Sequence, residues 1–157
     1  MRVRASIVVL AAVLAVAGLS AQAKPDLSGV WTLVPEKSDF GALAPPTKQT
    51  RTITHKEPTL KIVTEQSADA TGDTKIETTF TTDGKPQANN VMGSPMSTVG
   101  SWDGTTLVLK STLKTDGGDV SMEDRYSLTD GGKTLVMTRS FSSAEGSTAQ
   151  KMTFAKK

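Results

Sequence analysis

The chain contains few side chains that could carry out covalent or metal chemistry. It has 157 residues, no cysteine and a single histidine, His55. No Gly-x-Ser-x-Gly motif occurs, and His55 has no second histidine or cysteine with which to complete a metal site. Asp-x-Asp calcium loops and glycine-rich phosphate loops are also absent. We therefore expect no catalytic residue, no metal and no cofactor, although a lone imidazole could bind haem iron, act as a base, or form a hydrogen bond at a barrel rim.

Ionic and hydroxyl side chains indicate binding chemistry instead. Arg51 or Arg139 could hold a carboxylate through its N–H donors, with Tyr126 and Ser111 adding hydroxyl groups. Asp124 offers the alternative that Arg139 simply pairs with it, because opposed charges on adjacent strands commonly do so. Ligand binding and ion pairing both require these side chains to face one common interior. The secondary structure that carries them must therefore place them on one face.

Threonine-rich alternation predicts that these elements are β-strands. After residue 23 the chain holds 23 threonines among 134 residues, and its aliphatic side chains are scattered singly rather than at helical spacing. Asp-Gly and Gly-Gly pairs recur between the alternating runs and are typical of tight hairpins. We expect ten strands, over residues 28–34, 48–56, 59–67, 73–82, 86–92, 95–102, 105–114, 120–129, 134–142 and 147–155.

The order of these strands predicts an all-β fold. Strands joined in sequence by short hairpins form an antiparallel up-and-down meander, and we expect this one to close into a barrel of 8 to 10 strands, because closure removes the exposed edges. A two-layer sandwich has the same turn spacing and stays open as an alternative. The long connection over residues 35–47 contains prolines that oppose a full helix, and it suits a loop over one end of the barrel.

Hairpin register predicts which side chains face inward. Two-residue loops centred on residues 131–132 and 117–118 independently select the same face of the strand 120–129, with Asp124 opposite Arg139. The inward face then carries all the candidate ligand-binding residues, which are Arg51, His55, Ser111, Asp124, Tyr126 and Arg139. A wholly packed core would not be this polar, so we expect a small-molecule cavity.

Further loops extend this register. A turn at residues 57–58 would place Arg51 opposite Thr64, and a loop at residues 83–84 would pair the strand 73–82 with the strand 86–92. Arg125 should point to solvent opposite Lys110. Loops at residues 103–104 and 145–146 would align one inward row across five strands, consisting of Met96, Ser111, Asp124, Arg139 and Met152.

The first 23 residues have a pattern of their own. A basic head over residues 1–4, an apolar run over 5–19 and the small-x-small site 21–23 indicate a Sec signal peptide cleaved near Ala23. The apolar run is shorter than the ~20 residues that span a bilayer. Residues 24–157 then form a single domain with 16 basic and 16 acidic side chains, so no affinity for nucleic acid is expected. We expect a monomer, periplasmic or secreted, with no membrane span in the mature chain.

Gly29 and Trp31 form a Gly-x-Trp motif at the start of this domain, within Leu27-Ser28-Gly29-Val30-Trp31. This motif resembles the first strand of the lipocalin and calycin group. The stretches 27–43, 55–58, 102–104 and 130–133 also resemble a family of exported bacterial lipocalin-like domains of unassigned function. The resemblance implies a lipocalin-like barrel in which Gly29 and Trp31 close one end, with a late-strand basic residue, here Arg139, packed against the indole.

These observations together favour a binding module. We expect an exported lipocalin-like protein that encloses a small apolar or amphipathic molecule. Two alternatives from other classes stay open. One is an enzyme built around the cavity, either an isomerase or a haem-dependent catalyst that uses His55, and the other is an interaction protein of the cell envelope with no ligand.

Overall fold

The computed structural model describes residues 23–69 and 72–157, so nearly all of the predicted signal peptide lies outside the described residues. The ten predicted strands are confirmed, each within two residues of its expected ends. They are β1 (Gly29–Leu33), β2 (Lys48–Lys56), β3 (Thr59–Ala68), β4 (Gly72–Thr81), β5 (Pro86–Val91), β6 (Ser94–Asp103), β7 (Thr106–Thr115), β8 (Gly118–Thr129), β9 (Thr134–Ser143) and β10 (Gly146–Lys156).

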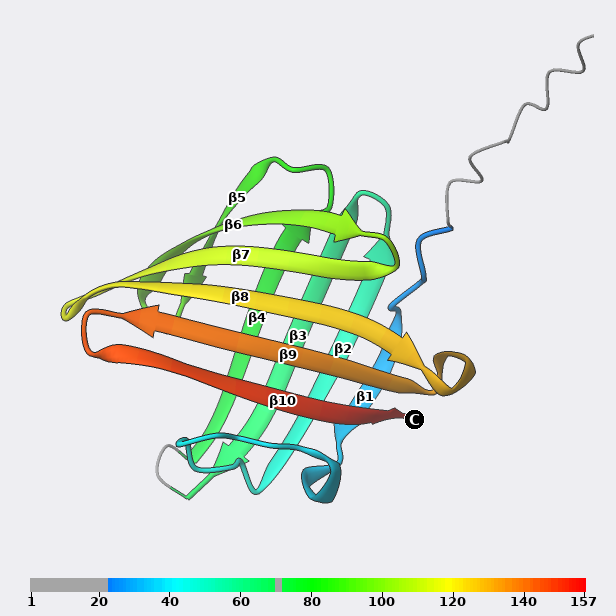
Figure 1. Ribbon diagram of the computed structural model, residues 1–157, viewed down its shortest axis with the longest axis horizontal. Helices are drawn as coiled ribbons and strands as arrows, with labels where there is room; N and C mark the ends of the chain where they lie inside the picture. The colour runs from blue at the N-terminus through cyan, green and yellow to red at the C-terminus, as the bar shows by residue number, and fades with distance from the viewer. Residues whose placement is uncertain (1–22, 70–71) are drawn as a thin grey trace, which may run out of the picture.

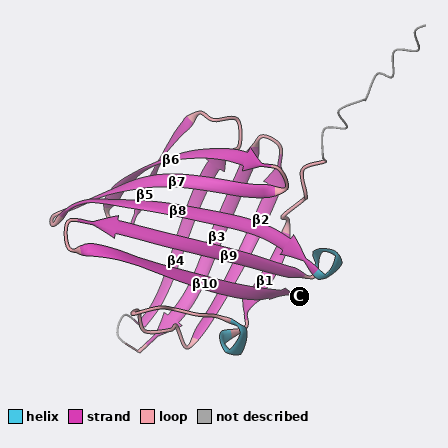
Figure 2. Ribbon diagram, in the orientation of Figure 1, coloured by secondary structure: helices cyan, strands magenta, loops and turns pink. Residues whose placement is uncertain are grey.

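A single antiparallel sheet, in the order β4-β3-β2-β1-β10-β9-β8-β7-β6-β5, wraps into the expected barrel. Strands β6 to β10 cross in front of β1 to β4, and the first strand lies beside the last (Figure 1). The β1–β10 ladder is short, running from Trp31 opposite Lys156 to Leu33 opposite Phe154. Strand dominates the colouring by secondary structure (Figure 2). The described residues contain no helix long and apolar enough to cross a membrane.

Strands β4 and β5 form the seam of the barrel, and the predicted ladder between them is wrong. The amide of Thr82 donates to the carbonyl of Pro58 at 2.8 Å, and the amide of Gly84 donates to that of Gly100 at 2.9 Å. Residues 82–85 therefore bend toward the β2–β3 hairpin and toward β6, instead of forming the two-residue turn that a ladder would need.

The side chain of Asn89 bridges this seam. Its amide group donates to the carbonyl of Thr79 and accepts from the amide of Thr79, both at 2.9 Å, as a neighbouring backbone would. Close by, a Cβ placed on Gly100 would lie 2.3 Å from the carbonyl oxygen of Thr81. Only glycine lets β6 approach β4 this closely, so Gly100 helps to keep the barrel closed.

Two of the predicted hairpin registers are confirmed. Asp124 lies opposite Arg139 on β8 and β9, and Arg51 lies opposite Thr64 on β2 and β3. The three loops predicted at 103–104, 117–118 and 145–146 are each displaced by one residue, so their pairings shift by two. A shift of two preserves the inward face. The inward row that contains Asp124 is therefore wrong as predicted, and consists of Gly100, Leu109, Asp124, Arg139 and Gln150.

Alternate hairpins of an up-and-down barrel lie at the same end, so the barrel has two distinct ends. At the end of the β2–β3, β6–β7 and β8–β9 hairpins, large apolar side chains fill the interior. Those with no exposed surface are Leu27, Trp31, Leu60, Leu107, Leu135, Met137 and Phe154. We call this the closed end. Burial of these side chains supplies a large share of the stability of the fold.

The opposite end is covered by the loop over residues 38–47, as the prolines of that connection predicted. The short 3-10 helix η1 (Pro35–Lys37) lies between β1 and this loop. Asp39 anchors the loop through reciprocal backbone hydrogen bonds of 2.7 Å with Lys151 on β10. The hydroxyl of Thr153 also donates to the carbonyl of Lys37 at 2.8 Å. The loop covers this end without filling its interior, and the cavity described below leads to it. We therefore call it the open end.

Candidate ligand-binding cavity

An internal cavity of about 210 Å³ lies between the packed closed end and the open end. Its wall mixes polar and apolar side chains, as the inward register predicted. Of the six predicted ligand-binding residues, five line this cavity and His55 does not. The lining residues are Gln49, Arg51, Ile62, Thr64, Gln66, Ile76, Thr78, Phe80, Val91, Met96, Ser111, Leu113, Met122, Asp124, Tyr126 and Arg139.

A wider hollow of about 640 Å³ continues from this cavity at the open end. Phe40, Leu43 and the prolines at 45 and 46 form its outer wall, and they come from the covering loop. The inner cavity and the hollow share four lining residues, which are Gln49, Arg51, Gln66 and Arg139. These four polar side chains therefore form a neck between the two spaces, and we refer to them as the neck.

Asp124 and Arg139 form a bidentate ion pair in the cavity wall. The guanidinium donates from Nε to Oδ1 at 2.6 Å and from Nη2 to Oδ2 at 2.5 Å. Burial by itself would lower the pKa of Arg139, but the charge of Asp124 and its hydrogen bonds outweigh burial and raise it. Ser111 is similarly engaged, since its hydroxyl lies 2.7 Å from that of Thr98. The pairing that the sequence left open for Arg139 is thus present.

Arg51 is in a different position, because no described carboxylate forms an ion pair with it. Only 4% of the surface of Arg51 is exposed. Nη1 donates to the hydroxyl of Tyr126 at 2.8 Å and lies 2.9 Å from the sulfur of Met137. The guanidinium also lies 5.2 Å from the ring centroid of Phe154.

The Arg51 site is incomplete from the standpoint of charge. Among the described residues, Nε has no hydrogen-bond partner, and the groups that contact the guanidinium are the Tyr126 hydroxyl, the Met137 sulfur and the Phe154 ring. A buried cation without a counter-ion is unfavourable unless an anion joins it. Burial raises the pKa of Tyr126, which keeps its hydroxyl protonated beside Arg51. A carboxylate in the cavity would therefore meet one free cationic donor and one hydroxyl.

His55 lies at the closed end, outside the cavity. Its Nδ1 accepts from the amide of Leu27 at 3.3 Å, and its Nε2 lies 3.0 Å from Oε1 of Glu57. Since Nδ1 is used as an acceptor, Nε2 is the nitrogen that can donate to the carboxylate of Glu57. Both nitrogens are engaged by protein groups, which agrees with a hydrogen bond at the rim and leaves neither nitrogen for haem iron or a substrate.

Glu57 is the centre of this closed-end network. It accepts from the hydroxyl of Thr82 at 2.6 Å and from the indole of Trp102 at 2.7 Å, and Lys24 lies 3.4 Å away. Burial would raise the pKa of Glu57, but the hydrogen bonds from Thr82, Trp102 and His55 outweigh it and lower the pKa to about 2. The network ties the start of the domain to three hairpin regions.

Gly29 and Trp31 lie at this end of the barrel, but the partner that the family resemblance implied for Trp31 is wrong. Trp31 is fully buried and its indole donates to the carbonyl of Leu27 at 3.0 Å. Nζ of Lys156, not Arg139, lies 5.1 Å from the indole centroid. A Cβ on Gly29 would lie 2.7 Å from Cε of Lys156. Arg139 is committed to Asp124, so the last strand supplies the cation instead.

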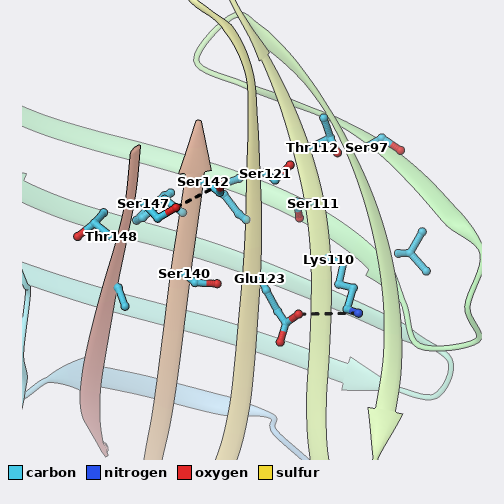
Figure 3. Close-up of a pocket in the computed structure, with 14 residues that line it drawn as sticks. Ser97, Lys110, Ser111, Thr112, Ser121, Glu123, Ser140, Ser142, Ser147 and Thr148 are labelled. Atoms are coloured by element: carbon cyan, nitrogen blue, oxygen red, sulfur yellow. Dashed lines mark hydrogen bonds and ion pairs between the residues drawn. The ribbon is translucent and has the colours of Figure 1, made fainter. Parts of the chain in front are cut away.

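A separate hollow of about 920 Å³ lies against the outer face of β6 to β10. Most of its labelled side chains are outward-facing serines and threonines, together with an ion pair between Lys110 and Glu123 (Figure 3). Lys110 thus faces Glu123 rather than Arg125, which instead pairs with Asp103 at 2.6 Å. Water can satisfy the exposed hydroxyls of this face. None of its lining residues has a buried polar atom without a hydrogen-bond partner, whereas Gln49 and Arg51 of the inner cavity do.

No known family profile matches the chain, and no curated protein matches it. Solved structures do match, and all those described here are below 25% identity, so they show the fold alone. Secretory abundant heat soluble protein 4 from Ramazzottius varieornatus is 20% identical, with a TM-score of 0.59 over 87% of this chain and 99% of that one.

Two further solved structures are named for their ligands. Zebrafish ileal bile acid-binding protein, complexed with cholic acid, is 16% identical with a TM-score of 0.55. A mutant of the REP1-NXSQ fatty acid transporter is 15% identical with a TM-score of 0.56. Each alignment covers 83% of this chain and 98% of the other. The lipocalin-like barrel is confirmed as a fold, whereas an exported bacterial family stays a prediction.

Sequence reasoning missed Gln49 as a cavity residue. It is 5% exposed, its Nε2 donates to Oε1 of Gln66 at 2.7 Å, and its own Oε1 has no partner. The signal was present, because Gln49 and Arg51 are two residues apart on one strand and so share a face. A polar side chain at an inward position of β2 was the observation that could have found it.

Proposed function

We propose that this protein is an exported binding barrel that encloses a small amphipathic molecule with an anionic head and an apolar body. Arg51 carries the proposal, because it is a buried guanidinium with no counter-ion among the described residues. The apolar part of the ligand would lie against side chains such as Ile62, Ile76 and Phe80. This division of labour is usual in ligand cavities, where a few polar groups orient a mostly apolar molecule.

The size of the cavity bears on how the ligand would sit. Ligand cavities commonly measure ~300–1,000 Å³, and the inner cavity, at about 210 Å³, is smaller. A ligand anchored at Arg51 would fill the inner cavity and reach the neck, with the hollow under the covering loop as its access route. The similar barrels named for bile acid and fatty acid binding support the class of ligand without deciding it.

Displacement of a fluorescent anionic probe tests this function. Residues 24–157 would be titrated with 1-anilinonaphthalene-8-sulfonate and then with decanoic acid and decanol. We expect the acid to displace the probe at concentrations about tenfold lower than the alcohol. Because Arg51→Met should itself bind the anionic probe weakly, its affinities for acid and alcohol would be measured directly by isothermal titration calorimetry, and they should be equal. Arg125→Met, which alters an outward arginine, should keep the preference for the acid. The proposal fails if neither compound displaces the probe, or if acid and alcohol compete equally in the unaltered protein.

Export is part of the proposal and has a test of its own. The full chain, expressed in a bacterium with a Sec pathway, should appear in the periplasm or medium with Lys24 as its first residue. N-terminal sequencing of the fractionated protein would check this. Recovery of the uncleaved chain from the cytoplasm would contradict export, while leaving the binding function to be judged separately.

A further inference from the structure

Two unsatisfied polar atoms lie on the same strand at the neck. Oε1 of Gln49 and Nε of Arg51 have no hydrogen-bond partner, although both residues are more than nine-tenths buried, at 5% and 4% exposure. Residues i and i+2 of a strand face the same way, so both side chains point inward from β2. An unsatisfied buried polar group is unfavourable, so two of them within one cavity wall are unusual.

The two atoms have opposite hydrogen-bonding character. Arg51 Nε–H is a donor, since the guanidinium has only donors. Gln49 Oε1 is an acceptor, because the Nε2 of the same amide is already used as the donor to Gln66 at 2.7 Å. Both residues line the inner cavity and the hollow at the open end, so a ligand head at the neck would lie beside both side chains.

We infer that the ligand is a hydroxy acid, meaning a carboxylate with a hydroxyl on one of the first carbons of its chain. This inference rests on the proposed function and sharpens its ligand class. The carboxylate would accept from Arg51 and from the hydroxyl of Tyr126, and the ligand hydroxyl would donate to Oε1 of Gln49. A plain fatty acid offers acceptors only, so it would leave the carbonyl of Gln49 unsatisfied.

The rest of the cavity limits the chain of this ligand. Beyond the neck, the wall consists of Ile62, Ile76, Phe80 and Val91 together with hydroxyls such as Thr78. A space of about 210 Å³ is too small for a long extended tail in addition to its head. A medium-length acyl chain is therefore the better match, with its tail inward and its head at Arg51 and Gln49.

Three acids of equal chain length test this inference. Decanoic, 2-hydroxydecanoic and 3-hydroxydecanoic acid would each compete with 1-anilinonaphthalene-8-sulfonate for the mature protein. We expect one of the hydroxy acids to bind about tenfold more tightly than decanoic acid, which corresponds to about 1.4 kcal/mol. Gln49→Met should bring the ratio of the hydroxy acid and decanoic acid affinities close to one, because it removes the acceptor Oε1.

The outcomes separate this inference from the broader function. Equal affinity for all three acids in the unaltered protein would overturn the hydroxy-acid inference and leave a fatty-acid-type site standing. A preference that survives in Gln49→Met would also overturn it, since the hydroxyl would then be recognised elsewhere. If none of the acids displaces the probe, the proposed function itself is wrong. The comparison in the unaltered protein does not depend on the variant folding.

Discussion

The two ends of the barrel use buried polar groups in opposite ways. At the closed end, the carboxylate of Glu57 accepts hydrogen bonds from four side chains, and both ring nitrogens of His55 have partners. At the neck, Arg51 has no counter-ion among the described residues and its Nε has no partner, like Oε1 of Gln49. Both regions pack against the same apolar core. The difference teaches that this barrel satisfies its polar groups at the closed end and leaves some unsatisfied at the neck, which is why we propose the neck as the position of a ligand head.

The Asp124–Arg139 pair includes one residue of the neck, but its polar groups satisfy each other, as those at the closed end do. Replacing Asp124 by alanine would leave a largely buried guanidinium without its partner, and we expect a loss of about 3 kcal/mol in the free energy of unfolding. Urea denaturation would measure it. The double variant Asp124→Ala/Arg139→Ala should lose less than the sum of the two single variants. Additive losses would show that the two side chains are not energetically coupled.

Glu57 should show its contribution through pH. Because its pKa in the folded protein, about 2, lies below the ordinary 4.5, ionised Glu57 stabilises the fold. That contribution is complete above about pH 4.5 and disappears as the pH falls toward 2. Glu57→Gln should cost roughly 1–2 kcal/mol at neutral pH, after allowance for its partial exposure.

Urea midpoints from pH 6 to pH 2 would test the Glu57 prediction. The unaltered protein should lose stability more steeply with acid than Glu57→Gln does. Glu145→Gln, at an exposed hairpin, is the matched control and should follow the unaltered protein. Identical slopes for all three proteins would mean that the closed-end network does not hold a charged carboxylate.

Arg51 should behave differently from both. Arg51→Met removes an uncompensated buried cation and keeps an apolar stem, but it also leaves the hydroxyl of Tyr126 without its partner. These effects oppose each other, so we expect the free energy of unfolding to change by no more than about 1 kcal/mol. Anionic-probe binding should fall sharply in the same variant. A large loss of stability together with intact binding would invert the contrast between the two ends.

Arg125 gives the smallest expected effect. It is the sequence neighbour of Asp124 but points outward, where it pairs with Asp103 and Glu123 while 40% of its side chain stays exposed. Exposed ion pairs contribute little, so Arg125→Ala should cost about 0.5 kcal/mol or less. Parallel urea melts of Arg125→Ala and Asp124→Ala would test the inward register directly. Equal losses would show that the inward face of β8 is assigned wrongly.

Local sequence patterns determined much of this structure by themselves. Threonine-rich alternation and Asp-Gly or Gly-Gly punctuation located all ten strands, because strand period and turn chemistry are local properties. The same alternation placed Arg51, Ser111, Asp124, Tyr126 and Arg139 inside one barrel. Errors of two residues in three hairpin registers did no harm to these assignments, since such a shift changes the opposite neighbour but not the face.

Only the tertiary structure decided which polar side chains are satisfied. The sequence places Arg51 and Arg139 on one inward face, but whether each finds a carboxylate depends on strands far apart in the chain. The barrel brings Asp124 within hydrogen-bond distance of Arg139 and leaves Arg51 facing Tyr126 and Phe154. In the same way, Lys156 reached Trp31 because β10 closes against β1. Strand pattern fixes the face of a residue, whereas barrel closure and tilt select its partners across the interior.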